Sequence, residues 1–457
     1  MSRFNQKMVS AVSTIGPRFL PFADAASADL PLSRLLRLSL FQVSVGMALV
    51  MLVGTLNRVM IVELNVPSAL VSIMVSLPLL FAPLRALIGF RSDKHRSALG
   101  WRRVPYIWMG TLLQFGGFAI MPFALLVLAG AGEAASAPAW IGQFGAAVAF
   151  LLVGAGLHTT QTVGLALATD LAPVESQPKV VGLMYVMLLL GMIGSAFIYG
   201  ELLSDYSPGR LVQVVQGAAL VTMILNVVAL WKQEARHSGR ACQIDVDESF
   251  SEAWKGFASG GQAVRRLFVL GVGTMAFQME DVLLEPYGGD ILGLSVSSTT
   301  TLTATLAFGS LIGFSWASKV LSRGVDPFLM AAGGVLVGMP AFMAVIASGL
   351  FQIPWLFAVG AFLIGTGVGL FAHGTLTSTM NLAPKDKAGL ALGAWGAVQA
   401  TAAGLAMALG GIIRDLVASH HGSLAGYNSV YTLELVLLLA TLVVMIPLIR
   451  KAKPILV

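Results

Sequence analysis

The stretch F-Q-M-E-D-V-L-L-E-P-Y-G-G occupies residues 277–289. It places three carboxylates, Glu280, Asp281 and Glu285, in the second half of a segment that begins as an apolar span at Leu267. Ionisable groups are costly in hydrocarbon, so in membrane proteins they normally face the protein interior or a watery cavity and mark function. We therefore interpret the rest of the chain as the framework that surrounds this acidic segment.

The composition is that of a membrane protein. Of the 457 residues, 56% are hydrophobic and 11% are charged, and the mean hydropathy is +0.83. Apolar runs recur that are long enough for a helix to cross a hydrocarbon core of about 30 Å, whereas transmembrane strands would be about 10 residues long. The twelve predicted spans are 38–62, 66–90, 104–130, 139–169, 178–200, 210–231, 267–286, 295–318, 327–348, 353–380, 388–413 and 428–449. We therefore predict an all-α membrane protein.

The charge pattern predicts the orientation. Net charge is +6, and most of the 28 Lys and Arg residues fall in the segments on one side of the predicted spans. The positive-inside rule then places both termini in the cytoplasm. Because the basic residues are scattered over several loops, they do not form a nucleic-acid surface. The single cysteine, Cys242, excludes a disulfide framework and a cysteine metal cluster.

The halves of the chain look like repeats. The motif T-D-L-A-P at 169–173 returns as M-N-L-A-P at 380–384. Duplicated six-helix halves are typical of transporter-like folds that have a site between the halves near the midplane. The predicted parts are a cytoplasmic segment, a six-helix bundle, a cytoplasmic linker, a second six-helix bundle and a cytoplasmic tail, at 1–37, 38–231, 232–266, 267–449 and 450–457.

Aligning the halves pairs span one with span seven, so that N-R-V at 57–59 matches E-D-V at 280–282. Arg58 then lies at the height of Asp281. We predict that Arg58 pairs with Asp281 or Glu280 across the central cavity toward the outer side, because a buried charge without a partner is strongly unfavourable. Alternatively, these residues lie at the outer headgroup level and anchor the helix ends.

Three further carboxylate predictions follow. Asp281 and Glu285 are four residues apart and are expected to share a helix face. The sequence E-P-Y-G-G from Glu285 is expected to end its helix. Glu434, in span twelve, is expected to be an interface anchor.

Two histidines lie within predicted spans. His158 shares one face of span four with Gln161 and Thr162, and His373 lies four residues before Thr377 in span ten. A neutral imidazole can bind the magnesium of a chlorin, with nearby glycines leaving room for the flat ring, or relay protons. It can equally form an interhelical hydrogen bond with Thr or Gln. Beyond such a pigment magnesium, no metal site is expected.

Motifs of soluble enzymes are absent from the sequence. It has no phosphate-binding glycine loop, no serine nucleophile elbow and no H-E-x-x-H. We therefore expect no catalytic residues and a protein that is not an enzyme.

The loop G-F-R-S-D-K-H-R-S-A-L-G-W-R-R at 89–103 resembles the signature between the second and third helices of the major facilitator superfamily. In that superfamily the signature holds two helices and their loop together. The matching residues here include Gly89, Asp93, Lys94, Arg102 and Arg103. The resemblance implies the major facilitator fold and says nothing about a substrate.

Several stretches together resemble the PucC family of light-harvesting assembly proteins, a branch of that superfamily. They are G-T-L-N-R-V-M-I-V-E-L at 54–64, R-S-D-K-H-R-S-A-L-G-W-R-R-V-P-Y at 91–106, H-T-T-Q-T-V-G-L-A-L-A-T-D at 158–170, D-V-L-L-E-P-Y-G-G at 281–289 and F-A-H-G-T at 371–375. The form of the second stretch favours the members that serve the peripheral antenna over those that serve the core antenna.

The resemblance implies an assembly factor in the bacterial inner membrane or intracytoplasmic photosynthetic membrane that handles or delivers bacteriochlorophyll, expected to be bacteriochlorophyll a bound transiently. The implied partners are the antenna alpha and beta polypeptides, bacteriochlorophyll synthase, the membrane insertion machinery and lipids, and not nucleic acid. The choice of His158 and His373 as pigment ligands is our inference, not the family's. Two alternatives stay open: a proton-coupled secondary transporter of a small solute, or a pigment-free scaffold for antenna helices.

Overall fold

The computed structural model describes residues 30–80, 88, 92, 100–130, 136–173, 176–234, 262–321, 323–380 and 388–449. Within these ranges the chain is helical and contains no strand. Eleven of the described helices are long and apolar enough to cross a membrane, and a shorter apolar helix, Ser68–Leu79, is the twelfth. The prediction of an all-α multi-pass membrane protein is confirmed.

The first half of the chain contains α2 to α9. Span one is built from α2 (Leu32–Leu38), α3 (Leu40–Leu49) and two π-helical stretches, Val50–Leu56 and Val59–Glu63, so it begins six residues before the predicted 38. The other helices are α4 (Ser68–Leu80), α6 (Val104–Leu128), α7 (Ala139–Leu171), α8 (Gln177–Leu202) and α9 (Pro208–Leu230). Phe118, Met121 and Phe150 lie in the apolar core of this half.

The second half contains α11 to α17. Span seven is built from α11 (Ala263–Gln278), a 3-10 turn at Glu280–Val282 and α12 (Leu284–Asp290). The others are α13 (Val296–Leu321), α14 (Pro327–Phe351), α15 (Pro354–Met380), α16 (Ala388–His421) and α17 (Ser423–Met445), followed by a 3-10 turn at Ile446–Leu448. Phe277, Phe342 and Tyr431 lie in its core.

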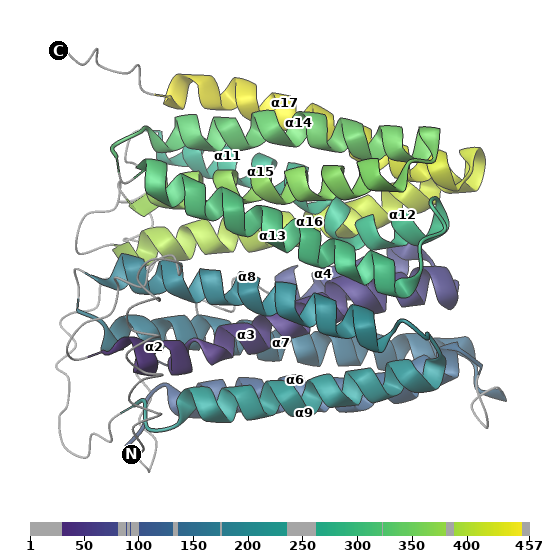
Figure 1. Ribbon diagram of the computed structural model, residues 1–457, viewed down its shortest axis with the longest axis horizontal. Helices are drawn as coiled ribbons and strands as arrows, with labels where there is room; N and C mark the ends of the chain where they lie inside the picture. Colours follow the sequence, from purple (N-terminus) through teal and green to yellow (C-terminus); the bar gives the residue numbers. More distant parts are fainter. Residues whose placement is uncertain are drawn as a thin grey trace, which may run out of the picture.

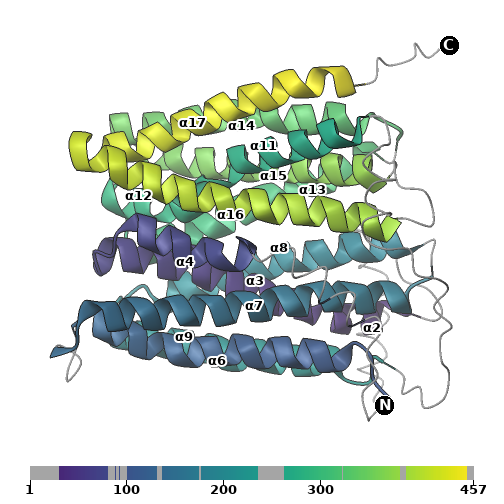
Figure 2. The same ribbon diagram turned by 180° about the vertical axis from the view of Figure 1, so that it is seen from behind.

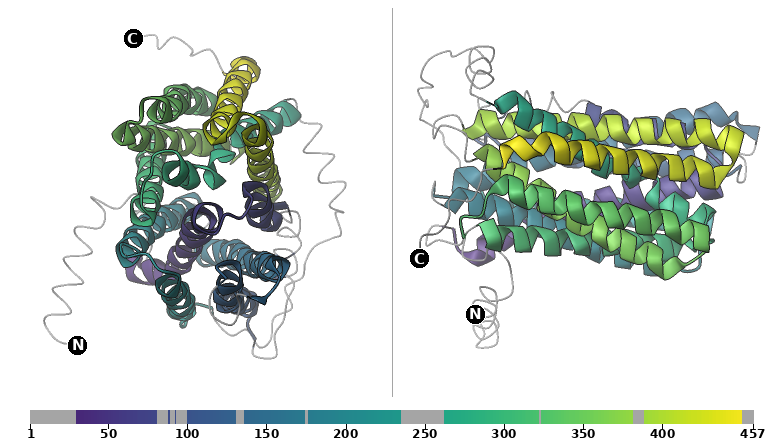
Figure 3. Two further views of the ribbon diagram at one scale, coloured as in Figure 1. Left: turned by 90° about the vertical axis from the view of Figure 1, so that its right-hand side faces the viewer. Right: turned by 90° about the horizontal axis from the view of Figure 1, so that it is seen from above.

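The halves contact each other in a pseudo-symmetric way. Helix α8, the fifth span, packs along α13, the eighth (Figure 1), and α4, the second span, packs along α16, the eleventh (Figure 2). Each pair matches the other when the halves are exchanged. The end-on view shows the helices of the two halves as two clusters side by side (Figure 3).

The two ends of the bundle differ. Helix α2 and the C-terminal end of α17 lie at one end, and α12 lies at the opposite end, together with the start of α4 (Figure 1). We refer to the second as the α12 end. Charged residues of both halves meet there.

Candidate functional site at a break in the seventh span

The seventh span is interrupted within the acidic segment. After α11 the chain makes the 3-10 turn Glu280–Val282, and a new helix, α12, starts at Leu284. Asp281 and Glu285 therefore do not share the face of one helix. The segment from Glu285 forms most of α12, and the span ends at Asp290, one residue after the predicted E-P-Y-G-G. Pro286 lies in the first turn of α12, where a missing N–H is tolerated, so the break precedes it.

Two side chains from other helices satisfy the backbone at this break. Pro286 has no N–H to donate to the carbonyl of Val282, four residues earlier, and this carbonyl instead accepts a hydrogen bond of 3.0 Å from Asn57 Nδ2. The N–H of Glu280 donates to Glu434 Oε1 at 2.7 Å. Since unpaired backbone groups are very unfavourable in a membrane, these two bonds make the break tolerable.

Glu434 is a core residue and not the expected interface anchor. Its relative exposure is 0%, and it lies eleven residues into α17, roughly 16 Å from the start of the helix. The sequence signal that could have found it is a single acid flanked by long apolar runs, which favours an internal role.

The prediction that Arg58 pairs with Asp281 or Glu280 is wrong. Its guanidinium forms an ion pair with Glu63 of its own span and donates to the carbonyl of Leu294 at 3.1 Å, across the interface between the halves. A Cβ atom at position 289 would lie 3.0 Å from Arg58 Nη2, so Gly289 in α12 leaves room for the guanidinium. The predicted alignment of span one with span seven places Arg58 at the correct depth, because the neighbouring Asn57 contacts Val282. The side chain of Arg58 nevertheless contacts different partners.

Glu285 lies against span one. It is 2% exposed and accepts a hydrogen bond from Thr303 of α13, and Arg58 is close enough to act on it electrostatically. A Cβ atom at position 54 would lie 2.5 Å from Glu285 Oε1, so a larger residue there would displace the Glu285 carboxylate. Gly54 lies in the first π-helical stretch, and such stretches are frequent at functional sites.

A carboxylate from the second half caps a helix of the first half. Asp415 of α16 accepts hydrogen bonds from Ser68 Oγ and from the N–H of Ala69, at the start of α4. The neighbouring Arg414 contacts Asp415 and Asp290, at 2.9 and 3.0 Å. The α12 end is therefore held closed by polar contacts between the halves.

The loop signature is only partly described. Gly89, Asp93 and Lys94 lie outside the described residues. Arg102 and Arg103 both form ion pairs with Asp170 at the end of α7.

The start of the linker completes this inner arrangement. Glu234 accepts hydrogen bonds from the N–H groups of residues 102, 103 and 104, at 2.8 to 3.1 Å. This carboxylate satisfies the free N–H groups at the start of α6.

The two membrane histidines lie on different helices and have different surroundings. His373 lies on α15, its ring packs edge-on against Phe314 at 4.3 Å between centroids, and its buried Nδ1 has no hydrogen-bond partner among the described residues. Thr377 follows one turn later on α15. His158, Gln161 and Thr162 lie on α7, and each takes part in an interaction.

The glycines near these histidines do not leave room for a macrocycle. A Cβ atom at Gly369 would lie 2.4 Å from the carbonyl oxygen of Ser310, and one at Gly156 would lie 2.5 Å from the backbone nitrogen of Gln114. These glycines let α13 pack on α15 and α7 pack on α6. The expectation of a glycine-lined space for a flat pigment is therefore wrong, because neighbouring backbones fill the space.

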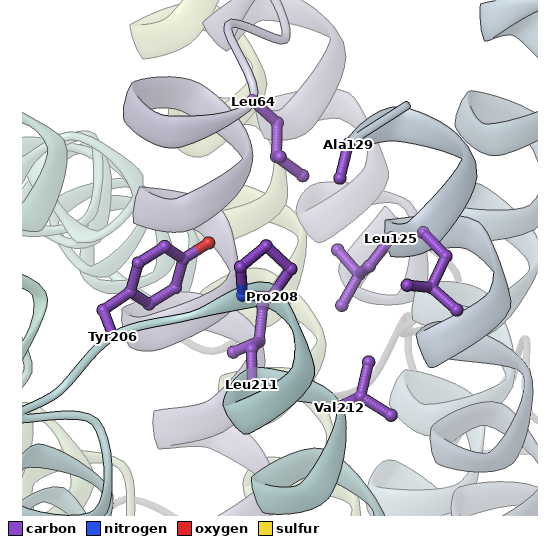
Figure 4. A pocket seen from close by; sticks show the side chains of 8 residues that line it. Leu64, Leu125, Ala129, Tyr206, Pro208, Leu211 and Val212 are labelled. Atoms are coloured by element: carbon purple, nitrogen blue, oxygen red, sulfur yellow. The ribbon is translucent and has the colours of Figure 1, made fainter. Parts of the chain in front are cut away.

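A small apolar pocket lies elsewhere, between α6, α9 and the end of span one. Leu64, Leu125, Ala129, Tyr206 and Pro208 are among its lining residues (Figure 4). It has room for about one water molecule, far less than the roughly 300–1,000 Å³ typical of ligand pockets. It does not include either membrane histidine.

Comparison with known proteins identifies close relatives. The family model described as "PUCC protein" matches residues 55–453. "Protein PucC" of Rhodovulum sulfidophilum is 62% identical over 437 residues, covering 95% of this chain and 96% of the relative. "Protein PucC" of Cereibacter sphaeroides is 56% identical and covers 99% of both. A more distant relative, "Bacteriochlorophyll synthase 44.5 kDa chain" of Rhodobacter capsulatus, is 28% identical over 84% of this chain and 88% of the relative.

Solved transporter structures share the fold. A bacterial homologue of the iron transporter ferroportin, in an inward-facing state, has a TM-score of 0.65 at 14% identity and covers 92% of this chain and 99% of its own. A bacterial homologue of the lysosomal transporter Spinster, inward-facing and occupied, has a TM-score of 0.63 at 15% identity, covering 92% and 98%. These likenesses establish the major facilitator fold and no more.

Proposed function

This chain belongs to the PUCC protein family, and from that premise we propose that it is an assembly factor for the peripheral light-harvesting antenna of phototrophic bacteria. The observation that carries the proposal is the family match over residues 55–453, together with 62% and 56% identity to two relatives named Protein PucC. In this role the chain handles bacteriochlorophyll a and delivers it to the antenna alpha and beta polypeptides. It acts as a chaperone and not as an enzyme.

The proposed setting is the bacterial inner membrane or its intracytoplasmic extension, with both termini in the cytoplasm. The proposed neighbours are bacteriochlorophyll synthase, the insertion machinery and lipids. The name of the 28% identical relative, a chain of bacteriochlorophyll synthase, supports a connection with this pigment.

His373 and His158 are the candidate ligands of the pigment magnesium, which a neutral imidazole can bind. His373 is half-buried, and because its Nδ1 is buried, Nε2 is the nitrogen that could bind a pigment at the surface of the helices. Since the glycines beside the histidines are closed by packing, the pigment ring would contact the surface of the helices rather than lie between α13 and α15.

The near-infrared absorption of membranes from a low-oxygen culture lacking this gene tests the assembly role. We expect loss of the peripheral antenna bands, with pigment synthesis and reaction centres retained. An unchanged spectrum would refute the assembly role.

Histidine variants test the pigment contact separately. We expect His373→Phe or His158→Phe to lower the pigment that copurifies with the protein, without unfolding the bundle. His420→Phe, near the end of α16, is the matched control. Unchanged pigment in both variants would remove the ligand assignment and leave the assembly role intact.

A further inference from the structure

Three carboxylates lie together at the break in the seventh span. The N–H of Glu280 donates to Glu434 Oε1, and the charged groups that act on the Glu280 carboxylate are those of Asp281 and Glu434, both acidic. Arg58, the cation closest to this region in span one, is committed to Glu63 and Leu294. The cluster therefore has acidic members from two helical segments and no basic one among the described residues.

Three carboxylate oxygen atoms of this cluster lack hydrogen-bond donors among the described residues. Both carboxylate oxygens of Glu280, and Glu434 Oε2, are buried without a partner within the described ranges. The hydroxyl of Tyr431, one turn before Glu434 on α17, is also buried and unpartnered, and its residue is 0% exposed. Tyr431 interacts electrostatically with Glu280 and Glu434, so its hydroxyl belongs to the same cluster.

The surroundings of the cluster offer no compensating charge. The edge of the Tyr431 ring packs on Tyr287 of α12 at 5.3 Å, and the ring stacks on Phe342 of α14 at 6.3 Å. From α16, the backbone near Gly410 packs against Met279. Like charges at close range in such a site oppose joint ionisation, because burial removes the water that would screen them.

We propose that Glu280, Asp281 and Glu434 form a proton-binding site, in which protons held among the buried carboxyl oxygens supply the missing donors. Asp281 keeps part of its surface exposed, unlike Glu280 and Glu434, and is the member through which protons enter and leave. The proposal concerns proton binding alone and is independent of antenna assembly. It also assigns Arg58 and Glu63 to a separate, structural ion pair.

Infrared spectroscopy of the purified full-length chain in lipid nanodiscs tests the site. We expect the wild-type protein to show the C=O stretch of protonated carboxylic acids at neutral pH, with a shift in D₂O and a loss of intensity on titration with alkali. Glu280→Gln, Asp281→Asn and Glu434→Gln should each reduce the band area. Gln has the shape of a protonated Glu, so these variants should fold, as circular dichroism can check.

Two controls sharpen the assignment. Glu63→Gln removes a carboxylate that is ion-paired and 34% exposed, and should leave the band unchanged. Glu285→Gln measures any contribution to the band from Glu285, a buried acid of α12 outside the cluster. If the band is absent from the wild-type protein, or survives in all three cluster variants, the site is not a proton site. A band that disappears on adding NaCl at constant pH would instead show a cation site and would also overturn the proposal.

Discussion

The hydrogen bond from Asn57 to the carbonyl of Val282 gives the sharpest stability prediction. Asn57→Ala removes the donor, and Pro286 cannot replace it because it has no N–H. The Val282 carbonyl is then buried without a partner. Val282, Leu283 and Asn57 are all fully buried, so water has no easy access.

The size of the effect follows from this geometry. Hydrogen bonds in membrane proteins contribute about 0.6 kcal/mol on average, since the partner left behind usually finds another. A buried group left unsatisfied costs about 1–3 kcal/mol. Because no donor replaces Asn57, we expect Asn57→Ala to lower the free energy of unfolding by about 2 kcal/mol.

Pro286→Ala supplies the missing N–H and should rescue the Asn57 variant. In the double variant the new N–H of residue 286 can donate to Val282, so the double loss should fall short of the sum of the single losses by about 1 kcal/mol. Unfolding by SDS in mixed micelles, followed by circular dichroism, measures each variant.

The control is Asn226→Ala. Asn226 is equally buried and donates a bond of the same length, 3.0 Å, to Thr111, but within the first half. The loss in free energy of unfolding caused by Asn226→Ala should add to the loss caused by Pro286→Ala. If Asn57→Ala and Pro286→Ala also add to within about 0.5 kcal/mol, the bond to Val282 does not compensate for the proline.

The same unfolding assay checks three other expectations. Breaking a buried ion pair lowers the free energy of unfolding by about 3–5 kcal/mol, and because Glu63 is 34% exposed we expect Arg58→Gln to lower it by nearer 2 kcal/mol. The double variant Arg58→Gln, Glu63→Gln should lose less than the sum of the two single variants. Full additivity would show that the pair is not coupled. Gly411→Ala should destabilise the protein, because its Cβ would lie 2.5 Å from a side-chain carbon of α4. Gly217→Ala, which has open space around it, should stabilise the protein by up to about 1 kcal/mol. Equal effects would contradict the close packing of α4 on α16. Asp415→Ala should cost about 1 kcal/mol as the loss of a helix cap, and a neutral effect would argue against that cap.

The fold was predictable because the bilayer imposes it on the sequence. Apolar length and the repeated motif are enough to predict twelve spans. The first copy of the motif spans the end of α7, and the second begins at Met380, the last residue of α15. The boundaries of span one were less accurate, since α2 continues the apolar helix toward the N-terminus and buries Leu35 and Leu38.

The partners of the buried charges were not predictable in the same way. Aligning spans one and seven gave the correct height for Arg58 but not its direction, which depends on the π-helical stretches on either side of it. Glu434, a lone acid beside a long apolar run, indicates an internal role but does not indicate its partner. Which acid meets which partner depends on the rotation of each helix, and hydropathy contains no information about that rotation.

The break in the seventh span also orders the biogenesis of the protein. Segments of a chain fold in the order of their synthesis, so Asn57 is already in the membrane when Val282 arrives, and the carbonyl finds its donor at once. The N–H of Glu280 has its acceptor, Glu434, only after the last span is synthesised. A nascent chain stopped before α17 therefore lacks this acceptor for a backbone group at the core of its second half.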